Sequence, residues 1–467
     1  MGRYKIPEDL YQYQKEDLER LLNTKINFLN LSEMGTGKTP TAIGLAMQGN
    51  FHKTLVVCPN SLKFEWKRQI LEWTELEHVS IARKSCYRRL ETLFEKVNGK
   101  EDPFFIINYE SFRSERHLEI LNLFPFDLLI LDEVHRLRNP STKQTKGMKS
   151  FLEVHPHCRV VGMTGSPIVN NPADLHTVLS LLYPEQYSPK ARMDFINRYC
   201  FWAPGVYGIQ ILGPRNLDIL REQTKSFTIR HTKKEVLSQL PDKYYRKVIL
   251  EMGEEQREVY RQMEEELFAL LDEGEPIYAT SVLAKLLRLR QINLEPHILG
   301  ISNSSSSKTE FIEDLIEDMS DKLVVFSCFE TYISYISSRI KVPHIVITGK
   351  VPVEERSGLV KRFQEDPSIR LCLGTVQTMG EGLTLTAASN VVFADRWWNP
   401  AVNVQAEDRL HRIGQKGSVR VIIPVNDRSV DSSLDRILEA KASYSKAYLG
   451  DSAVIREVIE DLRSGRS

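Results

Sequence analysis

The stretch GTGKT, residues 35–39, combines two glycines with a lysine and a threonine. Glycines let the backbone curl so that successive N–H groups point inward at an anion. Lys38 can then reach the outer phosphates of a nucleotide, and the Thr39 hydroxyl can ligate magnesium. The full phosphate-loop pattern has glycine where Ser32 stands, so for this stretch alone a structural glycine turn remains the alternative to nucleotide binding.

Two adjacent carboxylates are a second group of residues that could take part in catalysis: Asp132 and Glu133 follow the apolar run 128–131. Such a run suits a strand buried on both faces, and open α/β sheets bind ligands at the carboxyl ends of their strands. We expect Asp132 to hold Mg²⁺ and Glu133 to orient and deprotonate the attacking water. For the pair taken alone, a solvated acidic strand end is the alternative.

The hydrophobic pattern predicts the elements that position the glycine loop. The apolar run 28–31 before the loop predicts a short buried strand, and 41–47 after it repeats apolar residues at helical spacing. Strand, loop and helix follow in order, so the positive end of the helix dipole meets the loop. This order favours phosphate binding over a plain turn.

Both halves of the chain alternate strand-like runs with helical stretches, which predicts an α/β fold with parallel doubly wound sheets. The expected strands are 54–58, 104–107, 128–131 and 160–163 in the first half, and 323–326, 344–347, 371–374, 391–394 and 419–424 in the second. Residues 254–298 have a mostly helical pattern, and 302–307 are expected to form a flexible serine-rich loop. We therefore expect two similar lobes, 1–235 and 236–467, the second with a helical insertion at about 251–300.

The composition is that of a globular protein without a membrane anchor. Of 467 residues, 42% are hydrophobic and 27% charged, and the formal net charge is zero, so nucleic-acid binding would require a local basic surface. No uninterrupted apolar run of ~18 residues occurs, and the N-terminal MGRYKIPEDL lacks the apolar core of a signal peptide. Six cysteines are scattered without a C-x-x-C pair, so neither a zinc ribbon nor a disulfide framework is expected. We expect a cytoplasmic protein.

Arg409 and Arg412 stand three residues apart in QAEDRLHRIGQ, 405–415. On a helix this spacing places both on one face, where they could approach the same charged group. A leaving γ-phosphate needs positive charge, and an arginine that supplies it is worth ~10³ to 10⁵ in rate in known cases. A solvated helix face is the alternative for two arginines at this spacing.

These segments together resemble the Swi2/Snf2 branch of the superfamily 2 helicase-like ATPases, from Tyr11 to about Val430. The resemblance rests on an ordered series of motifs: YQYQKEDLERLL (Q motif), SEMGTGKT (I), LVVCPNSLKFEWKRQI (Ia), DEVHRLRN (II), MTGSPIVNN (III), KLVVFSCF (IV), GTVQTMGEGLTLTAAS (V) and QAEDRLHRIGQ (VI). The segments EGLTLTAAS and ADRWWNPAVNVQAEDRLHRIGQ are most similar to the annealing-helicase subgroup, which rewinds and remodels branched DNA. Because no appended reader domain is seen, the chain resembles a minimal prokaryotic or viral member, in the cytoplasm of a prokaryotic or virus-infected host cell.

The resemblance implies two RecA-like lobes with ATP and Mg²⁺ as cofactors. It implies ATP contacts from Gln14, Gly35, Thr36, Gly37, Lys38 and Thr39; metal contacts from Thr39 and Asp132; catalysis by Glu133, Arg409 and Arg412; coupling of ATP state to DNA by Thr164, Gly165 and Ser166; and DNA contacts from Lys63, Lys67, Arg68 and Thr384. For motif Ia, a solvated helix face is nearly as well supported as a DNA contact.

The activity implied by the resemblance is a DNA-dependent ATPase, a monomeric motor that translocates on or remodels duplex or branched DNA. Three alternatives remain: a strand-separating DNA helicase, an RNA-directed motor of the same superfamily, and an inactive DNA-binding scaffold. The scaffold is least favoured, because Lys38, Asp132, Glu133 and both arginines are present.

Two tryptophans, Trp397 and Trp398, precede motif VI. Paired aromatic rings could stack on a base or on adenine. Tryptophans are also large core residues, and we favour packing, with these two supporting the helix expected to present Arg409 and Arg412.

Overall fold

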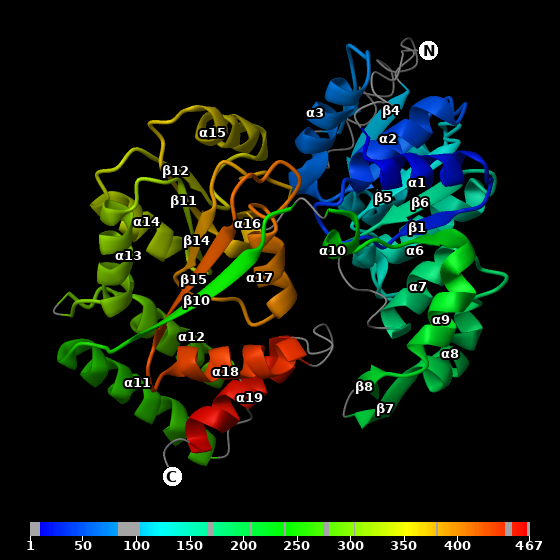
Figure 1. Cartoon of the computed structure of the whole chain (residues 1–467). Coiled ribbons are helices and arrows are strands. Elements are labelled where there is room, and N and C mark those ends of the chain that lie inside the picture. The colour runs from blue at the N-terminus through cyan, green and yellow to red at the C-terminus, as the bar shows by residue number, and fades with distance from the viewer. Residues whose placement is uncertain are drawn as a thin grey trace. The chain divides into compact units, whose positions relative to one another are not determined.

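The computed structural model describes residues 10–82, 103–165, 172–205, 208–237, 240–273, 280–302, 304–379, 382–443 and 451–464. The chain divides into two compact units, Met1–Ser238 and Gln239–Ser467, and each contains its own parallel sheet (Figure 1). In the described ranges, no helix is both long enough and apolar enough to cross a membrane.

Unit 1 is built on a seven-stranded parallel sheet in the order β3-β4-β2-β5-β6-β1-β9. Its strands are β1 (Phe28–Asn30), β2 (Thr54–Cys58), β3 (Ser80–Ile81), β4 (Phe104–Asn108), β5 (Leu128–Asp132), β6 (Arg159–Met163) and β9 (Thr228–Ile229). Consecutive residues of β2 face opposite sides of the sheet. Leu55 and Val57 pack into one hydrophobic cluster and Val56 and Cys58 into the other, which explains the unbroken apolar run.

Helices cover both faces of this sheet. They are α1 (Gln12–Leu22), α2 (Lys38–Gln48), α3 (Lys63–Trp73), α5 (Glu115–Leu121), α6 (Lys143–Val154), α7 (Pro172–Leu182), α8 (Arg192–Tyr199), α9 (Leu217–Thr224) and α10 (Lys233–Val236). The first three pack on one face, whereas α5 to α9 pack on the other. An antiparallel hairpin, β7 (Cys200–Gly205) and β8 (Gly208–Pro214), lies beyond α8 and α9 (Figure 1).

Unit 2 contains a six-stranded parallel sheet in the order β10-β15-β14-β11-β13-β12. Its strands are β10 (Lys243–Leu250), β11 (Leu323–Ser327), β12 (His344–Ile347), β13 (Leu371–Thr375), β14 (Asn390–Phe393) and β15 (Val419–Asn426). Its helices are α11 (Glu254–Asp272), α12 (Thr280–Leu294), α13 (Ser307–Asp318), α14 (Glu330–Arg339), α15 (Val353–Glu365), α16 (Val376–Met379), α17 (Pro400–Glu407), α18 (Val430–Ser443) and α19 (Asp451–Ser464). Helices α11, α12, α18 and α19 pack together in a separate cluster.

The predicted doubly wound parallel sheets are confirmed. Every strand expected from an apolar run is present, with ends that differ by a residue or two. The edge strand β10 was not expected, because most of its side chains are at least partly exposed and its sequence, KYYRKVIL, has no continuous apolar run. The hairpin β7–β8 was not expected either.

The expectation of a flexible serine-rich loop at 302–307 is wrong for the residues described there. Ser306 caps α13: its Oγ donates to Leu294 O over 2.6 Å and accepts from Thr309 N over 3.3 Å. The Ser307 hydroxyl donates to Asn426 Oδ1 over 2.8 Å. Serine hydroxyls that find buried backbone and side-chain partners fix a segment whose composition alone suggests flexibility.

Candidate active site

The glycine loop joins β1 to α2, and its backbone requires glycine at two positions. Gly35 and Gly37 have φ values of 80° and 74°, in the left-handed region that side chains other than glycine rarely adopt. Gly37 immediately precedes α2, so the loop meets the positive end of that helix. Thr36 is 2% exposed, and its hydroxyl donates to Glu33 O over 2.8 Å. The loop is therefore held in a shape suited to an anion.

The lysine of the loop is held by neutral acceptors. Lys38 Nζ donates to the carbonyl oxygens of Ser32 and Glu33 over 2.7 and 2.9 Å. Its side chain is only half-buried, so an incoming phosphate can replace these carbonyls with a charged partner. Thr39, the next residue of α2, is also partly exposed and offers its hydroxyl from the first helical turn.

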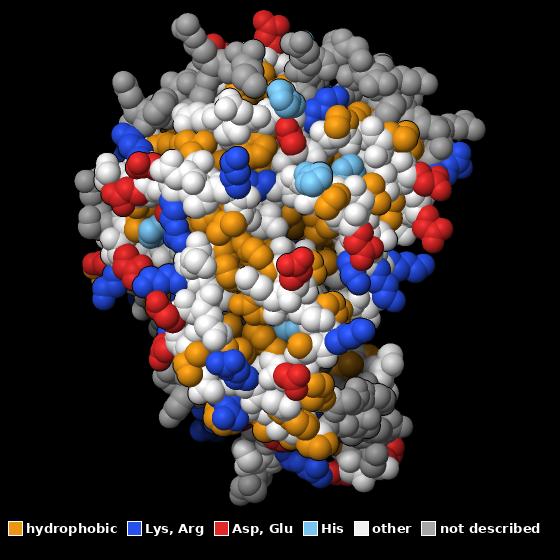
Figure 2. Space-filling view, turned by 90° about the vertical axis from the view of Figure 1, so that its right-hand side faces the viewer, with side chains coloured by type: hydrophobic (Ala, Val, Ile, Leu, Met, Phe, Trp, Pro, Cys, Tyr) orange, Lys and Arg blue, Asp and Glu red, His pale blue; other side chains and the backbone are white. Residues whose placement is uncertain are grey.

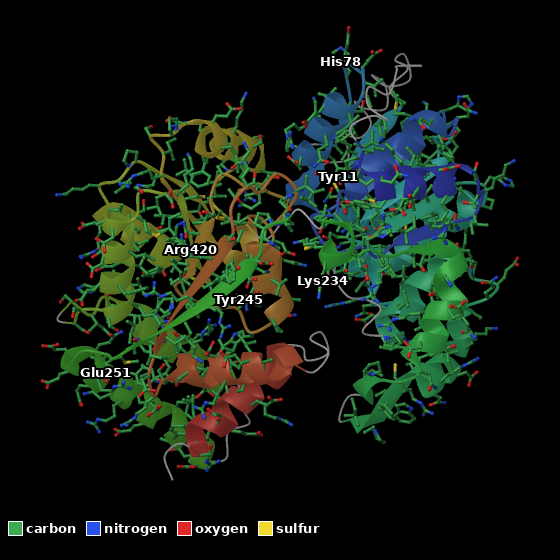
Figure 3. All side chains as sticks on the ribbon, viewed as in Figure 1. Tyr11, His78, Lys234, Tyr245, Glu251 and Arg420 are labelled. Atoms are coloured by element: carbon green, nitrogen blue, oxygen red, sulfur yellow. The ribbon has the colours of Figure 1, made fainter. Side chains whose placement is uncertain are left out.

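Gln14 of α1 braces the same loop. It is 3% exposed, and its Nε2 donates to the carbonyl oxygens of Thr36 and Gly37, both over 3.2 Å. Its Oε1 accepts from the backbone N–H of Tyr11, labelled in Figure 3, over 2.9 Å. The Tyr13 hydroxyl adds a bond to Thr36 O over 2.7 Å. These contacts place Gln14 at the phosphate loop, whereas its expected contact with ATP stays a prediction.

The parallel register brings the sequence motifs to one edge of the sheet. Met163 of β6 pairs with Asn30 of β1 on one side and with Asp132 of β5 on the other. The glycine loop, Thr164 and Glu133 follow these strand ends, so all three leave the sheet at its carboxyl edge. Residues far apart in sequence therefore share one site.

Asp132 is held at three points. Its Oδ2 accepts from the indole N–H of Trp66 over 2.7 Å, and its Oδ1 accepts from the backbone N–H of Glu133 over 3.0 Å. The Tyr109 hydroxyl donates to its backbone oxygen over 2.8 Å. Burial, and then the charge of Glu133, raise the pKa of Asp132 to about 6, while the Trp66 hydrogen bond and Lys38 act in the opposite direction. A bound divalent cation would favour the ionised form.

Glu133 has a backbone in the left-handed region, with φ 54°, where a residue other than glycine is uncommon. Its Oε2 accepts from Thr164 Oγ1 over 2.9 Å and lies 3.1 Å from Nδ1 of His135. Burial pushes the pKa of Glu133 upward, but His135, Lys38 and Thr164 outweigh this effect and lower the pKa to about 2. The carboxylate is therefore ionised and held in one orientation.

Of the three expected coupling residues, two are described. Thr164 is fully buried and is the partner of Glu133 already given. Gly165 packs against the segment after β1, because a Cβ at that position would lie 2.2 Å from Met34 Cγ. Ser166 lies outside the described residues.

The expected DNA contact of Lys63 is wrong. Lys63 is 2% exposed, and its Nζ donates to Ala82 O over 2.5 Å, so the ammonium is used inside unit 1. Burial lowers its pKa. Lys67 is half-exposed, and Arg68 is exposed and paired with two glutamates of α3 at 2.7 and 2.6 Å. On the face shown in Figure 2, basic and acidic side chains are interspersed, in keeping with a net charge of zero.

Arg409 and Arg412 belong to unit 2, and the expectation that they share a helix face is wrong. Helix α17 ends at Glu407, and the arginines follow in a turn and a bend. Arg409 is 6% exposed, whereas Arg412 is half-buried. The backbone oxygen of Arg409 accepts a hydrogen bond from Leu385 N of motif V over 2.9 Å. A longer α17 would have used this oxygen for a bond within the helix.

Motifs V and VI are joined by a further residue that sequence reasoning missed. Gln415 Nε2 donates to Ala388 O over 2.8 Å and to Leu410 O over 3.0 Å. Thr384 is half-buried and directly precedes Leu385, so it lies beside this junction.

Strand β10 holds the end of α17. Glu407 is 4% exposed, and its Oε2 accepts from Lys243 Nζ and from the hydroxyl of Tyr245, each over 2.7 Å. Tyr245 is labelled on β10 in Figure 3. Burial works against the charge of Lys243, but Glu407 and Asp408 outweigh it and raise the pKa of that lysine. The turn that carries Arg409 is thus anchored at its start.

Both tryptophans before motif VI pack in unit 2. Trp398 is 4% exposed, and the Arg290 guanidinium lies 4.3 Å from its ring centroid. Arg290 is itself paired with Asp395 at 3.1 Å. Trp397 is partly buried against the core of the sheet. These contacts agree with packing and leave Trp398 no exposed ring face for stacking on a base.

Trp66, Tyr109 and His135 are site residues that sequence reasoning missed. Trp66 and His135 stand inside motifs Ia and II, so their position was visible, but their partners were not. Tyr109 follows β4 and lies outside the motifs of the family resemblance. Trp66 and His135 could have been found as aromatic and histidine side chains that lie within motifs expected to meet at the Asp132–Glu133 pair.

Comparisons with known proteins identify the family of the chain. Residues 13–298 match the SNF2-related domain, and residues 307–414 match the helicase conserved C-terminal domain. Similar curated proteins include the DNA annealing helicase and endonuclease ZRANB3 of Mus musculus (27% identical, 98% of this chain and 42% of that protein), the SWI/SNF-related matrix-associated actin-dependent regulator of chromatin subfamily A-like protein 1 of Xenopus tropicalis (29%, 94% and 44%) and an uncharacterized ATP-dependent helicase of Mycoplasma pneumoniae (26%, 93% and 41%).

A similar solved structure is the Sulfolobus solfataricus SWI2/SNF2 ATPase core in complex with dsDNA, 24% identical with a TM-score of 0.43, covering 99% of this chain and 98% of that one. The chain spans about two fifths of the length of the curated relatives it matches. The SNF2-related match covers more than half of the sequence and contains the glycine loop and the Asp132–Glu133 pair. The chain therefore belongs to the SNF2-related family of helicase-like ATPases.

Proposed function

We propose that this protein is a DNA-dependent ATPase that couples ATP hydrolysis to translocation on, or remodelling of, duplex or branched DNA. The observation that carries the proposal is the shared carboxyl edge of β1, β6 and β5, where the Lys38 loop and the Asp132–Glu133 pair come together. Family membership and the annealing-helicase name of one relative support DNA as the substrate.

The residues of unit 1 fit ATP with Mg²⁺. The two glycines with positive φ give the loop a curled shape that can surround an anion, Lys38 is a half-buried cation beside it, and Thr39 and Asp132 offer the hard oxygen donors that magnesium prefers. Magnesium, when bound, would neutralise charge on the outer phosphates. Gln14 keeps the loop in shape from α1.

Glu133 is proposed to orient the attacking water and to take its proton as the water oxygen bonds to the γ-phosphorus, while the bond from that phosphorus to the β–γ bridging oxygen breaks and ADP leaves. Its depressed pKa means that it is ionised before attack, so it accepts a hydrogen bond from water in the ground state. Thr164 and His135 fix the direction of its carboxylate. Orientation is therefore the larger part of its role in the resting enzyme.

The second lobe, proposed as 236–467, would supply the arginines to the ATP-binding lobe, proposed as 1–235. Arg409 and Arg412 are proposed to stabilise the negative charge that develops on the γ-phosphate as it leaves. Thr164, Gly165 and Ser166 are assigned to coupling, and Lys67, Arg68 and Thr384 to the DNA backbone. The motor is proposed to act as a monomer in the cytoplasm.

The test is the ATPase rate of the full chain with single-stranded, duplex and forked DNA and with duplex RNA. Duplex or forked DNA should stimulate most. Equal stimulation by duplex RNA would favour an RNA-directed motor, and no hydrolysis with any ligand would favour a scaffold. A strand-displacement assay beside a triplex-displacement assay then separates strand separation from duplex translocation.

A further inference from the structure

Helix α3 contains the second half of motif Ia, and a buried side chain of this helix reaches the nucleotide site. Its buried side belongs to the core cluster that also contains α2, the helix that follows the glycine loop. Its first residue is fixed by the Lys63 bond to Ala82 O described above. One turn further on, Trp66 is 2% exposed and projects into unit 1, while its neighbour Lys67 is half-exposed.

Trp66 meets the carboxylate assigned to magnesium. Its Nε1 donates to Asp132 Oδ2 over 2.7 Å, and the indole N–H can act only as a hydrogen-bond donor. The other oxygen of that carboxylate is held by the backbone of Glu133. The rotamer of Asp132 is thus defined by one bond within its own segment and one bond from α3.

We propose that Trp66 is a positioning residue that orients the Asp132 carboxylate for magnesium-bound ATP, and that through this bond helix α3 couples DNA contact at motif Ia to nucleotide binding. The proposal rests on the proposed function for its DNA part, whereas the orientation of Asp132 for magnesium does not depend on DNA.

The physical basis is an outer hydrogen bond that holds a metal-binding carboxylate in place. A carboxylate free to rotate would lose that freedom if a metal bound, so an existing hydrogen bond that already fixes its rotamer would improve affinity. A displacement of α3 moves the indole and therefore the carboxylate. Coupling of this kind is reciprocal: if DNA raises the affinity for magnesium-bound ATP, magnesium-bound ATP must raise the affinity for DNA equally.

The experiment measures equilibrium binding of a fluorescent ATP analogue to the full chain, with magnesium and with EDTA, for the natural protein and for Trp66→Phe. Phenylalanine keeps an aromatic ring in the core and removes the N–H donor. Magnesium should strengthen binding to the natural protein. In Trp66→Phe we expect this magnesium-dependent gain to fall by roughly tenfold or more, the scale of one hydrogen bond to a charged group, with binding in EDTA unchanged.

Trp73→Phe is the matched control. Trp73 lies at the end of the same helix and packs against the same cluster, but it is not a partner of Asp132. Because Trp66 is 2% exposed and Trp73 is only partly buried, Trp66→Phe should lose more stability in urea, so the titrations are compared under conditions in which both variants are fully folded. A magnesium-dependent gain that falls equally in both variants, or in neither, would overturn the proposal.

The double variant Trp66→Phe with Asp132→Asn tests the route of the effect. If Trp66 acts through Asp132, the substitution of Trp66 should have no further effect on the magnesium-dependent gain once the carboxylate is gone. An additive loss would contradict the assignment.

Repeating the titrations with duplex DNA tests the coupling. The factor by which DNA tightens binding of magnesium-bound analogue should approach one in Trp66→Phe and stay unchanged in Trp73→Phe. If DNA does not tighten binding even in the natural protein, the coupling through α3 fails; the DNA part of the proposed function is decided separately by DNA stimulation of the ATPase rate, and the magnesium result decides the orientation of Asp132.

Discussion

The hydroxyl of Thr164 donates to Oε2 of Glu133 over 2.9 Å, which joins the residue after β6 to the carboxylate after β5 that we propose to be catalytic. Thr164 is fully buried, and His135 approaches the same oxygen at 3.1 Å. The direction of the carboxylate is therefore determined by tertiary contacts between neighbouring strand ends.

Replacing Thr164 with valine should lower ATP turnover about tenfold or more and leave ATP affinity nearly unchanged, because valine keeps the shape but cannot donate to the charged oxygen. Thr164→Ser should recover most of the rate. Steady-state turnover and ATP-analogue binding on both variants check this, and a normal rate in the valine variant would remove the orienting role of Thr164.

Lys38 and Glu133 should separate binding from chemistry. Lys38→Ala should abolish turnover by weakening phosphate binding, with the fold intact, since the lysine side chain is only half-buried. Glu133→Gln should bind ATP and stall, because the amide cannot take the proton of the attacking water. Nucleotide binding and turnover measured on both proteins decide the point: equal loss of ATP affinity in the two variants contradicts separate roles.

Arg412→Ala should lower DNA-stimulated turnover by roughly a thousandfold or more, the scale for loss of a cation that stabilises the transition state, with ATP and DNA binding nearly unchanged. The half-buried position of Arg412 makes this variant a milder structural change than removal of the buried Arg409. Turnover within a few-fold of the natural protein would mean that Arg412 is a solvated turn residue.

The stimulation by duplex DNA should fall steeply with added salt, because phosphate contacts release counterions and log affinity falls with log salt concentration. ATPase titrations with DNA at several salt concentrations give the slope. Lys67→Ala should reduce that slope, whereas Lys63→Ala should instead reduce stability, because the Lys63 ammonium is buried against Ala82 O.

His231 should contribute stability that depends on pH. Its Nε2 lies 3.0 Å from both carboxylate oxygens of Asp17, and this hydrogen bond raises the pKa of His231. A raised folded-state pKa gives stability that is complete below the unfolded value of about 6.5 and is lost as pH rises through the folded value. His231→Gln should therefore destabilise more at about pH 6 than at about pH 9, as urea unfolding can measure. Asp17→Asn should show the same pH dependence, and a pH-independent loss would refute the ion pair.

The sequence by itself determined the strands and the residues that we propose for ATP binding and catalysis. Strands buried on both faces need continuous apolar runs, as in β2 and β5, so their positions were visible without any knowledge of their neighbours. The glycine loop and the Asp132–Glu133 pair were visible for a similar reason, because each depends on residue types adjacent in the chain.

Only the tertiary structure decided which groups the individual side chains contact. From the sequence, Lys63 is a lysine on a predicted helix and would be expected at the surface. It is buried because its ammonium donates to the carbonyl of Ala82, which is distant in sequence. The spacing of Arg409 and Arg412 is compatible with a helix, but α17 ends at Glu407, and Arg409 N and Leu410 N then bond three residues back, to Ala406 O and Glu407 O. Trp66 could have packed anywhere in the core, and its bond to Asp132 exists because the fold places α3 beside the end of β5. Contacts between residues far apart in sequence depend on where the whole chain places them, which local pattern does not encode.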